Sequence, residues 1–381
     1  MSLCIAGMGW VTPLGSGVSE VWDRLLRGEE ASPEKISDPV GQKPYTLFRV
    51  PESALKNLGT HPRLRRASAI SRFAAGAGLA ALKDAGLRMA IDKPERIALV
   101  LAIANGGVNY TKRFFHDIVA AGAEAASPLL FPETVFNAAA SHLAAIIGTT
   151  GRSYTLVGDG AVGVLAFRMA EDLMANDELD YCLVVGAEEA DWILCDAYRK
   201  WRLLRSAPPI QPFHKPAKGT VLSEGAGAIL LGRSGGVEIE VTHPGGYYST
   251  QETLKEAVHR VVSDLRAPET GLAVVSANGT FIDQAEALAM AELLPEALLY
   301  TAKPALGESV GAGGLWQIIA AAQTLRTGRI PPRPHTPSHG LPQPTGEVNP
   351  VESHRAIVVG CGLNQQVGGL RMSAQPVNDG Y

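Results

Sequence analysis

The most constraining feature of the sequence is the segment 151–176, GRSYTLVGDGAVGVLAFRMAEDLMAN. Residues 154–157 predict a short buried strand, and 158–160 predict a tight turn. From Ala161 onward, apolar residues recur at helical spacing and predict a helix. A turn of this kind directs free backbone N–H groups at whatever lies above it, so α/β enzymes hold a nucleophile or an anion there. Gly160, at the apex of the turn, offers no side chain for this chemistry.

Strand and helix patterns alternate along the rest of the chain and predict two βα-rich halves in series. We place the halves at residues 1–233 and 234–381, the second being the shorter. Continuous apolar runs predict buried strands at 97–104, 180–187, 272–276 and 355–362. Helical spacing predicts helices at 18–27, 63–86, 136–147, 251–265, 283–294 and 315–326, with surface loops at 31–62 and 329–350. This alternation is typical of parallel sheets with helices on their faces.

Composition excludes several classes of function. The net charge of the 381-residue chain is −4, which gives no general case for binding nucleic acid or membranes. No apolar run reaches the roughly 18 residues of a membrane span, and the N-terminus does not read as a signal peptide. The four cysteines are scattered without a CxxC pair, so we expect buried, reduced thiols rather than disulfides or a metal site. The expected location is the cytoplasm.

Residues 158–163, GDGAVG, match the dinucleotide-binding pattern GxGxxG after a strand and before a helix. This signal is weak because it lies in the middle of the chain and lacks an acidic residue about 20 residues further on. Asp159 also puts a carboxylate beside the N–H groups that a pyrophosphate would need. We therefore expect no cofactor.

Seven stretches in order carry a more specific signal. They are GMGWVTPLG (7–15), the turn at Gly160, VVGAEEAD (184–191), PFHKPAKGTVLSEGAGAILL (212–231), SANGT (276–280), KPALGESVGAGG (303–314) and VVGCGL (358–363). This series resembles the β-ketoacyl synthases of the thiolase superfamily over nearly the whole chain. The resemblance implies a thiolase-like α/β fold of two similar halves in five layers, αβαβα, and a dimeric assembly.

The family's chemistry uses a cysteine at the turn and two histidines. By resemblance, the cysteine position falls on Gly160, the first histidine position on Asn278 and the second on Glu308. The family's lysine remains as Lys303, and the position of its gating phenylalanine carries Cys361. We therefore expect no catalytic residue at these positions.

A replacement site is the alternative. Asp159, Asn278 and Glu308 could form a new polar site, or they could have drifted into a cavity that no longer performs chemistry. A buried unpaired carboxylate is costly, so we expect Glu308 to pair with Lys303. Cys361 is the least unfavourable substitute nucleophile. The pocket residues expected here are Asp159, Lys303 and Cys361.

The function that the resemblance implies is that of a non-catalytic subunit. It is similar to the chain-length factors of type II polyketide and aryl polyene pathways, which pair with an active ketosynthase and shape its acyl tunnel during elongation on an acyl carrier protein. Those factors commonly carry glutamine where this chain has Gly160. The alternative is an acyl-thioester hydrolase or transferase that uses Asp159 and Glu308 through water. An active ketosynthase working alone comes third.

Aromatic residues concentrate in 110–136 of a chain that contains only 6% of them, and we expect this stretch to be loop-like. The family resemblance implies a dimer interface beside the end of the acyl tunnel. Ordinary core packing is an equally weighted alternative. The residues concerned are Tyr110, Phe114, Phe115, Phe131 and Phe136.

Overall fold

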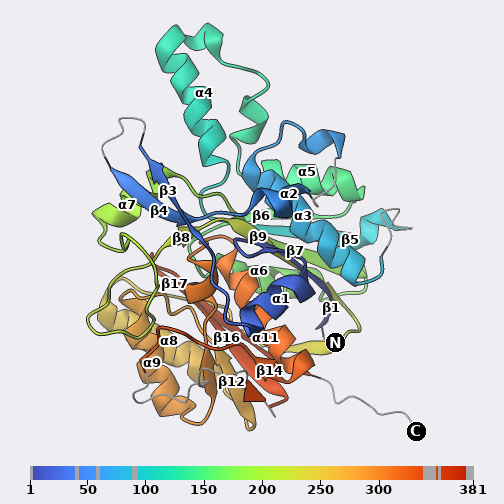
Figure 1. Ribbon diagram of the computed structural model, residues 1–381. Coiled ribbons are helices and arrows are strands. Elements are labelled where there is room, and N and C mark those ends of the chain that lie inside the picture. The colour runs from blue at the N-terminus through green and yellow to red at the C-terminus, as the bar shows by residue number, and fades with distance from the viewer. Residues whose placement is uncertain are drawn as a thin grey trace.

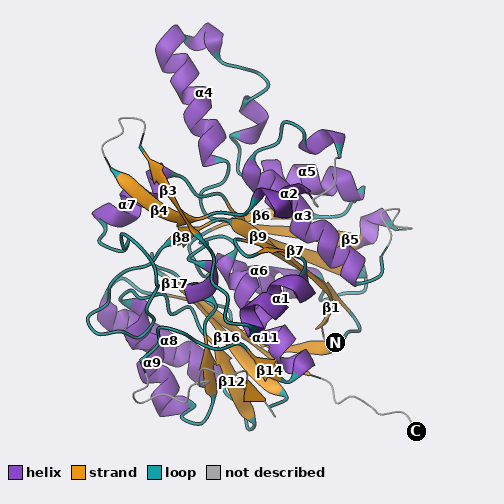
Figure 2. Cartoon of the chain, in the orientation of Figure 1, coloured by secondary structure: helices purple, strands orange, loops and turns teal. Residues whose placement is uncertain are grey.

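The computed structural model describes residues 3–38, 43–56, 61–87, 93–337, 349–350 and 353–374. A mixed sheet forms its centre (Figures 1 and 2). The strands of the N-terminal half run in the order β1 (Leu3–Thr12), β9 (Gly225–Gly232), β7 (Tyr181–Glu188), β5 (Ile97–Ile103) and β6 (Ser153–Val157). Those of the C-terminal half run in the order β10 (Val237–Thr242), β17 (Gln366–Ala374), β16 (Arg355–Cys361), β12 (Thr270–Val274) and β13 (Leu298–Tyr300).

The two halves repeat one topology. In each half the two outer strand pairs are parallel, and the strands nearer the junction are antiparallel. The halves join where β1 pairs antiparallel with β10, at Leu3 opposite Ile239 and Cys4 opposite Glu238. The expected parallel sheets are thus correct only for the outer strands. The expected division at residues 233 and 234 lies in the turn between β9 and β10 and stays a prediction.

Helices cover the strands in layers (Figure 1). Helices α3 (Ala69–Asp84) and α5 (Ala138–Ile147) pack on the outer face of the N-terminal strands. Helices α8 (Gln251–Leu265) and α9 (Ile282–Leu293) pack on the outer face of the C-terminal strands. Helices α6 (Val162–Leu173) and α11 (Gly313–Thr327) lie between the two sets of strands. The five-layer thiolase-like α/β fold is therefore confirmed.

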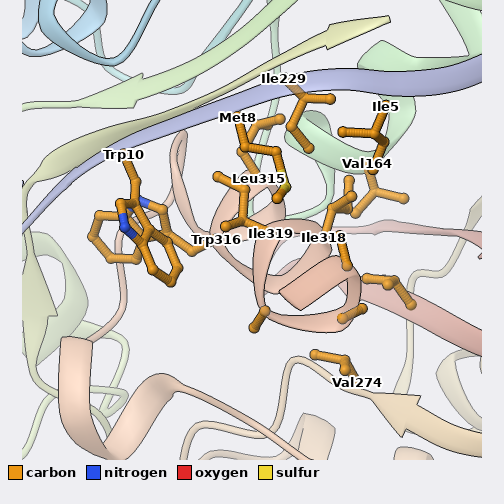
Figure 3. Close-up of a cluster of buried hydrophobic side chains, with 14 of the residues drawn as sticks. Ile5, Met8, Trp10, Val164, Ile229, Val274, Leu315, Trp316, Ile318 and Ile319 are labelled. Carbon is orange, nitrogen blue, oxygen red and sulfur yellow. The ribbon is translucent and has the colours of Figure 1, made fainter. Parts of the chain in front are cut away.

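The central layer is apolar and closely packed. Figure 3 shows Met8 and Ile229 of the N-terminal strands beside Leu315, Ile318 and other residues of α11. A Cβ on Gly163 of α6 would lie 3.3 Å from the Gly314 Cα. Glycines therefore let α6 and α11 approach closely, which fixes the positions of the turns that precede them.

The remaining elements surround this frame. They are α1 (Val18–Leu26), α2 (Glu52–Lys56), α4 (Val108–Ala121), α7 (Trp192–Lys200), α10 (Lys303–Leu306), the short strands β2 (Gly15–Ser16), β11 (Gly246–Tyr247), β14 (Arg329–Ile330) and β15 (Asn349–Pro350), and a three-stranded sheet of β3 (Pro33–Ser37), β4 (Pro44–Phe48) and β8 (Leu222–Ser223). Four single turns of 3-10 helix complete the structure: η1 (Pro62–Leu64), η2 (Pro94–Arg96), η3 (Ala123–Ala125) and η4 (Phe131–Glu133).

Three sequence expectations were wrong. The expected loop at 31–62 contains the β3–β4 hairpin and α2, with Leu47 and Phe48 fully buried. The expected loop-like stretch after Gly107 contains α4, which projects away from the body in Figure 1. The strand β6 is an edge strand rather than a buried one, since Tyr154 and Val157 are 44% and 51% exposed.

Within the described ranges, no helix is both long enough and apolar enough to cross a bilayer. All four cysteines are buried and free, as expected.

Candidate functional site

The turn between β6 and α6 presents Gly160 to the interior of the site. Its backbone is not in the left-handed region. A Cβ built on it would lie 3.4 Å from the Gly362 Cα and 3.9 Å from Glu308 Oε1, which are ordinary contact distances. Neither conformation nor space therefore requires glycine here. The absence of a side chain at position 160 therefore concerns the chemistry of the site and not its packing.

Opposite Gly160, three side chains form a closed polar cluster. Lys303 Nζ donates to Glu308 Oε1 at 2.6 Å, and Asn278 Nδ2 donates to Glu308 Oε2 at 2.6 Å. The Asn278 Oδ1 accepts from the Thr280 hydroxyl at 2.7 Å and from its backbone N–H at 3.2 Å. The side chains of the pair are only 6% and 4% exposed. The expected Lys303–Glu308 pair is present, and both carboxylate oxygens of Glu308 have a donor.

The backbone holds Glu308 in place from both sides. Gly307 has φ +82°, and a Cβ on it would lie 2.7 Å from Phe48 and from Ser223. The Glu308 N–H donates to the Val221 carbonyl at 2.8 Å, and the Ser223 N–H donates to the Glu308 carbonyl at 2.9 Å. The loop that carries Glu308 is therefore tied to the segment leading into β8.

Asp159 forms a second carboxylate site beside the turn. It accepts backbone N–H groups from Ala161 at 3.2 Å, Asn364 at 3.0 Å and Gln366 at 3.2 Å. Burial raises the pKa of Asp159 to about 6, against the opposing effect of these hydrogen bonds. The carboxyl lies over Gly362, where an added Cβ would be 2.0 Å from it. The Ala161 N–H at this turn, and the N–H groups of Asn364 and Gln366 beside it, are thus already occupied by the chain's own carboxylate.

Cys361, at the end of β16, does not suit a nucleophile. Its side chain is buried, and burial raises the pKa of its thiol well above the usual value. Its N–H donates to the Ser276 hydroxyl at 2.9 Å, and its carbonyl oxygen would lie 3.6 Å from a Cβ on Gly160. Cys361 lies beside Gly160, its place in the pocket stays a prediction, and burial disfavours its thiolate.

A pocket of about 550 Å³ opens beside Asp159. Tyr198 of α7, Trp201 directly after α7, Tyr247 of β11 and Gln366 of β17 line it with Asp159. Burial, together with the negative charges of Glu308, Glu188 and Asp159, raises the pKa of Tyr198. All three carboxyl groups therefore act electrostatically on the Tyr198 hydroxyl. Tyr247 and Trp201 are 76% and 63% exposed and form the rim.

Three further residues of this region, Glu188, Tyr198 and Gln366, had no role in the sequence-based predictions. Glu188 accepts the N–H groups of Ala104 at 3.2 Å and Gly311 at 3.1 Å, and burial raises its pKa to about 7. Gln366 Oε1 accepts the Asp159 N–H at 3.0 Å. Only the stretch VVGAEEAD pointed to Glu188. Gln366 begins a strand that the sequence pattern did not indicate, and no signal singled out Tyr198.

The structure brings six of the predicted residues into one region: Gly160, Asn278, Glu308, Asp159, Lys303 and Cys361. The predicted aromatic residues lie elsewhere. Phe114 packs edge-on against Phe115 and at a tilt against Phe131, with ring centroids 6.1 and 5.9 Å apart. The Tyr110 hydroxyl donates to the Arg66 carbonyl at 3.0 Å.

Three of these rings are on the surface of the chain. Phe115, Phe131 and Phe136 are 58%, 55% and 52% exposed. A Cβ on Gly106 would lie 3.0 Å from the Phe136 ring, so that ring covers the turn that follows β5. The interpretation of these three rings as ordinary core is wrong.

This chain is similar to β-ketoacyl synthases along most of its length. The N-terminal domain model of β-ketoacyl synthases matches residues 2–235, and the C-terminal domain model matches residues 235–337. A 3-oxoacyl-[acyl-carrier-protein] synthase 2 of Vibrio cholerae is 24% identical over 359 residues, which cover 86% of this chain and 87% of the relative. Nodulation protein E of Rhizobium leguminosarum is 26% identical over 234 residues, 60% of this chain and 57% of the relative.

Two solved structures share the fold over 98% of this chain and 99% of theirs. The ishigamide ketosynthase/chain length factor superposes with a TM-score of 0.86 at 20% identity. A type II polyketide synthase acyl-carrier protein in complex with its ketosynthase bound to the hexaketide gives 0.83 at 16% identity. With both domain models matched in order along residues 2–337, this chain belongs to the β-ketoacyl synthase family.

Proposed function

We propose that this chain is a non-catalytic ketosynthase-like subunit, a chain-length factor. It pairs with an active β-ketoacyl synthase, shapes the acyl tunnel, and serves elongation on an acyl carrier protein in polyketide, aryl polyene or fatty-acid-type synthesis. One observation carries the proposal: Gly160, which has no side chain, faces the fully hydrogen-bonded cluster of Lys303, Glu308 and Asn278.

The chemistry of condensation needs a nucleophile that holds the acyl chain and groups that stabilise the enolate and oxyanion. Gly160 supplies no nucleophile. Asn278 and Glu308 stand at the two histidine positions, and Glu308 is an anion where negative charge would have to be stabilised. Asp159 occupies the Ala161 N–H at the turn and the N–H groups of Asn364 and Gln366 beside it. Each of these features opposes acyl transfer by the chain alone.

Exposed apolar residues support the pairing. They lie on α4, in the residues that follow it up to Phe136, and on the edge strand β6. Val119 is 84% exposed, Leu129 66% and Val157 51%. Exposed apolar surface can mark an interaction site, and an edge strand offers unpaired backbone groups to a second chain. A partner with the same fold would extend the sheet from β6.

The alternative is a hydrolase in which Asp159 or Glu308 directs a lone pair at a water molecule. Both oxygens of Glu308 accept charged or amide donors, and both oxygens of Asp159 accept backbone N–H groups. These hydrogen bonds stabilise the ionised carboxylates and weaken them as bases, which counts against the alternative.

The test is co-expression with a β-ketoacyl synthase that retains cysteine and two histidines, chosen from the same gene neighbourhood. We expect one heterodimeric peak in size exclusion. Intact-mass spectrometry after incubation with acyl carrier protein loaded with an acyl chain should then find the acyl adduct on the partner only. A stable adduct on this chain would refute the non-catalytic role, and a homodimer that ignores the synthase would refute the pairing.

A further inference from the structure

The connection between β16 and β17, residues 362–365, borders the pocket beside the turn. Asn364 and Gln365 of this connection line the pocket. Gln365 has φ +87°, a left-handed conformation that is uncommon for a residue other than glycine and costs free energy. Such a conformation persists only where neighbouring groups hold the chain in place. The contacts that hold this connection therefore decide whether it can move.

The carboxylate of Asp159 holds the connection from the turn that precedes α6. Its Oδ2 atom accepts the N–H groups of Asn364 at 3.0 Å and of Gln366, the first residue of β17, at 3.2 Å. In return, the Asp159 N–H donates to Gln366 Oε1 at 3.0 Å. These hydrogen bonds join residues that lie 205 and 207 positions apart in the sequence. Each segment therefore both donates to the other and accepts from it.

Tyr248, in the segment after β11, holds the same connection through its carbonyl groups. The Tyr248 N–H donates to the Gln365 carbonyl at 2.9 Å, and the Tyr248 hydroxyl donates to the Gly362 carbonyl at 2.6 Å. Its ring is buried and packs edge-on against Phe281, with centroids 6.5 Å apart. Loss of the Asp159 contacts would leave this support in place. We therefore expect such a loss to loosen the connection locally, without unfolding of the strands that it joins.

In this closed arrangement the backbone before and within the connection lies against Gly160. The Gly362 Cα is 3.4 Å, and the Cys361 carbonyl oxygen 3.6 Å, from the place where a Cβ on Gly160 would lie. A methyl group fits at this place, but a longer bound chain would meet the backbone unless the connection moved. The family resemblance puts the acylated residue at this turn. The closed connection therefore stands where an acyl chain would have to go.

We propose that Asp159 is a latch, which keeps residues 362–365 closed against Gly160 and so excludes acyl chains from this chain's own site. The benefit of exclusion rests on the proposed function, whereas the latch itself does not. An acyl chain that entered a site without a nucleophile would not be elongated. A subunit that shapes its partner's tunnel therefore works best when its own site stays closed.

The test uses the full chain alone and measures how fast iodoacetamide alkylates Cys361, which precedes the connection directly and is 3% exposed. Asp159→Ala removes the acceptors of the Asn364 and Gln366 N–H groups. We expect this variant to raise the alkylation rate of Cys361 about tenfold or more, since each lost hydrogen bond favours local opening. Hydrogen exchange of the peptide that spans residues 362–366 should become faster as well.

Asp159→Asn is the matched control, because it removes the charge but keeps an oxygen that can accept both N–H groups. We expect Cys361 to stay slowly alkylated in this variant. Equal acceleration in both variants would overturn the latch, since it would reflect the loss of negative charge near the thiol. Similar acceleration at Cys4, Cys182 and Cys195, which are also buried, would show general destabilisation and would overturn it too. Unchanged rates in Asp159→Ala would have the same meaning.

Octanoyl-pantetheine is the probe for exclusion. It should slow the alkylation of Cys361 in Asp159→Ala, where the site is open, and should have no effect in the wild type. Protection in the wild type, or none in the variant, would overturn the exclusion. The latch and the proposed function also fail separately. Rapid alkylation of Cys361 in the wild type would refute only the latch, whereas a stable acyl adduct on the chain would refute the non-catalytic role.

Discussion

The ammonium of Lys303 donates a hydrogen bond of 2.6 Å to the carboxylate of Glu308, and both side chains are buried. Removal of one member of such a pair leaves an uncompensated charge in the interior. We expect Lys303→Met to lower the free energy of unfolding by about 3–5 kcal/mol. Chemical denaturation monitored by circular dichroism measures this change.

The matched control for that prediction is the double variant Lys303→Met/Glu308→Gln, which removes both charges. It should recover most of the lost stability, because an amide at position 308 keeps an acceptor for Asn278. If the single and double variants are equally unstable, the ion pair does not account for the effect.

Substitution by alanine should affect stability differently at two glycines that face each other across the site. Gly160→Ala should change stability by less than about 1 kcal/mol, since its Cβ meets only ordinary contacts. Gly362→Ala should cost about 1–3 kcal/mol, because its Cβ would lie 2.0 Å from the Asp159 carboxyl. Thermal denaturation of both variants tests this. Asp159→Gly combined with Gly362→Ala should relieve the clash, so a double variant as unstable as Gly362→Ala would contradict the assignment.

Restoring a thiol at the turn should not restore activity. We expect Gly160→Cys to fold but to form no condensation product with acyl and malonyl carrier proteins, because Asn278 and Glu308, which the family resemblance places at the two histidine positions, supply no imidazole. Asp159 and Glu308 also place negative charge beside the new thiol, which disfavours its thiolate. Alkylation by iodoacetamide across a pH series should show a thiol pKa above that of free cysteine. Rapid condensation by this single variant would contradict the interpretation of the site.

Asp159 should make stability fall as the pH rises from about 4 to 6. The unfolded chain releases this proton near pH 4, whereas burial keeps it bound in the folded chain until about pH 6. Over that interval the folded state binds more protons, so its stability decreases with pH, by about 3 kcal/mol for a shift of roughly two pKa units. Asp159→Asn removes this contribution. Its stability relative to the wild type should therefore rise between pH 4 and 6, and a pH-independent difference would argue against the shift.

If the aromatic cluster closes the end of an acyl tunnel in the assembled heterodimer, smaller side chains there should lengthen the product. Phe114→Ala and Phe115→Ala should each give longer products with nearly unchanged elongation rate, because a bulky ring at a tunnel end excludes further methylenes. Product mass distributions from the reconstituted heterodimer measure this. Val119→Ala, on the same helix and 84% exposed, is the control for a general effect on α4. Unchanged product length in an assembled complex would place the tunnel end elsewhere.

The sequence predicted many strands and the central helices of this protein well, because these elements follow a local periodicity of apolar residues. The runs at 97–104 and 180–187 correspond closely to β5 and β7. The strand β17, with Gly368 and Gly369 inside it, was not predicted, because glycines there make room for Leu165 and Val261 rather than follow strand propensity. The exposure of β6 could not be predicted either, since an exposed edge strand can be as apolar as a buried one.

The site was predictable at the positions that the family resemblance supplied, and the Lys303–Glu308 pair followed from the cost of a buried charge. The closed geometry around it was not predictable. The donors to Asp159 come from backbone at residues 364 and 366, about 200 positions away, and backbone groups carry no sequence signature. Tyr198 lies in a helix whose pattern gave no reason to direct it towards three carboxyl groups.

The two ends of the long sheet are unlike, and this difference limits how the chain can assemble. At one end β6 offers five residues with exposed side chains at Tyr154 and Val157. At the other end β13 has only three residues, and Leu299 and Tyr300 are buried. Two equivalent open ends would let copies add head to tail without limit, as in a filament. With one receptive end, association through the sheet terminates once a single neighbour has docked.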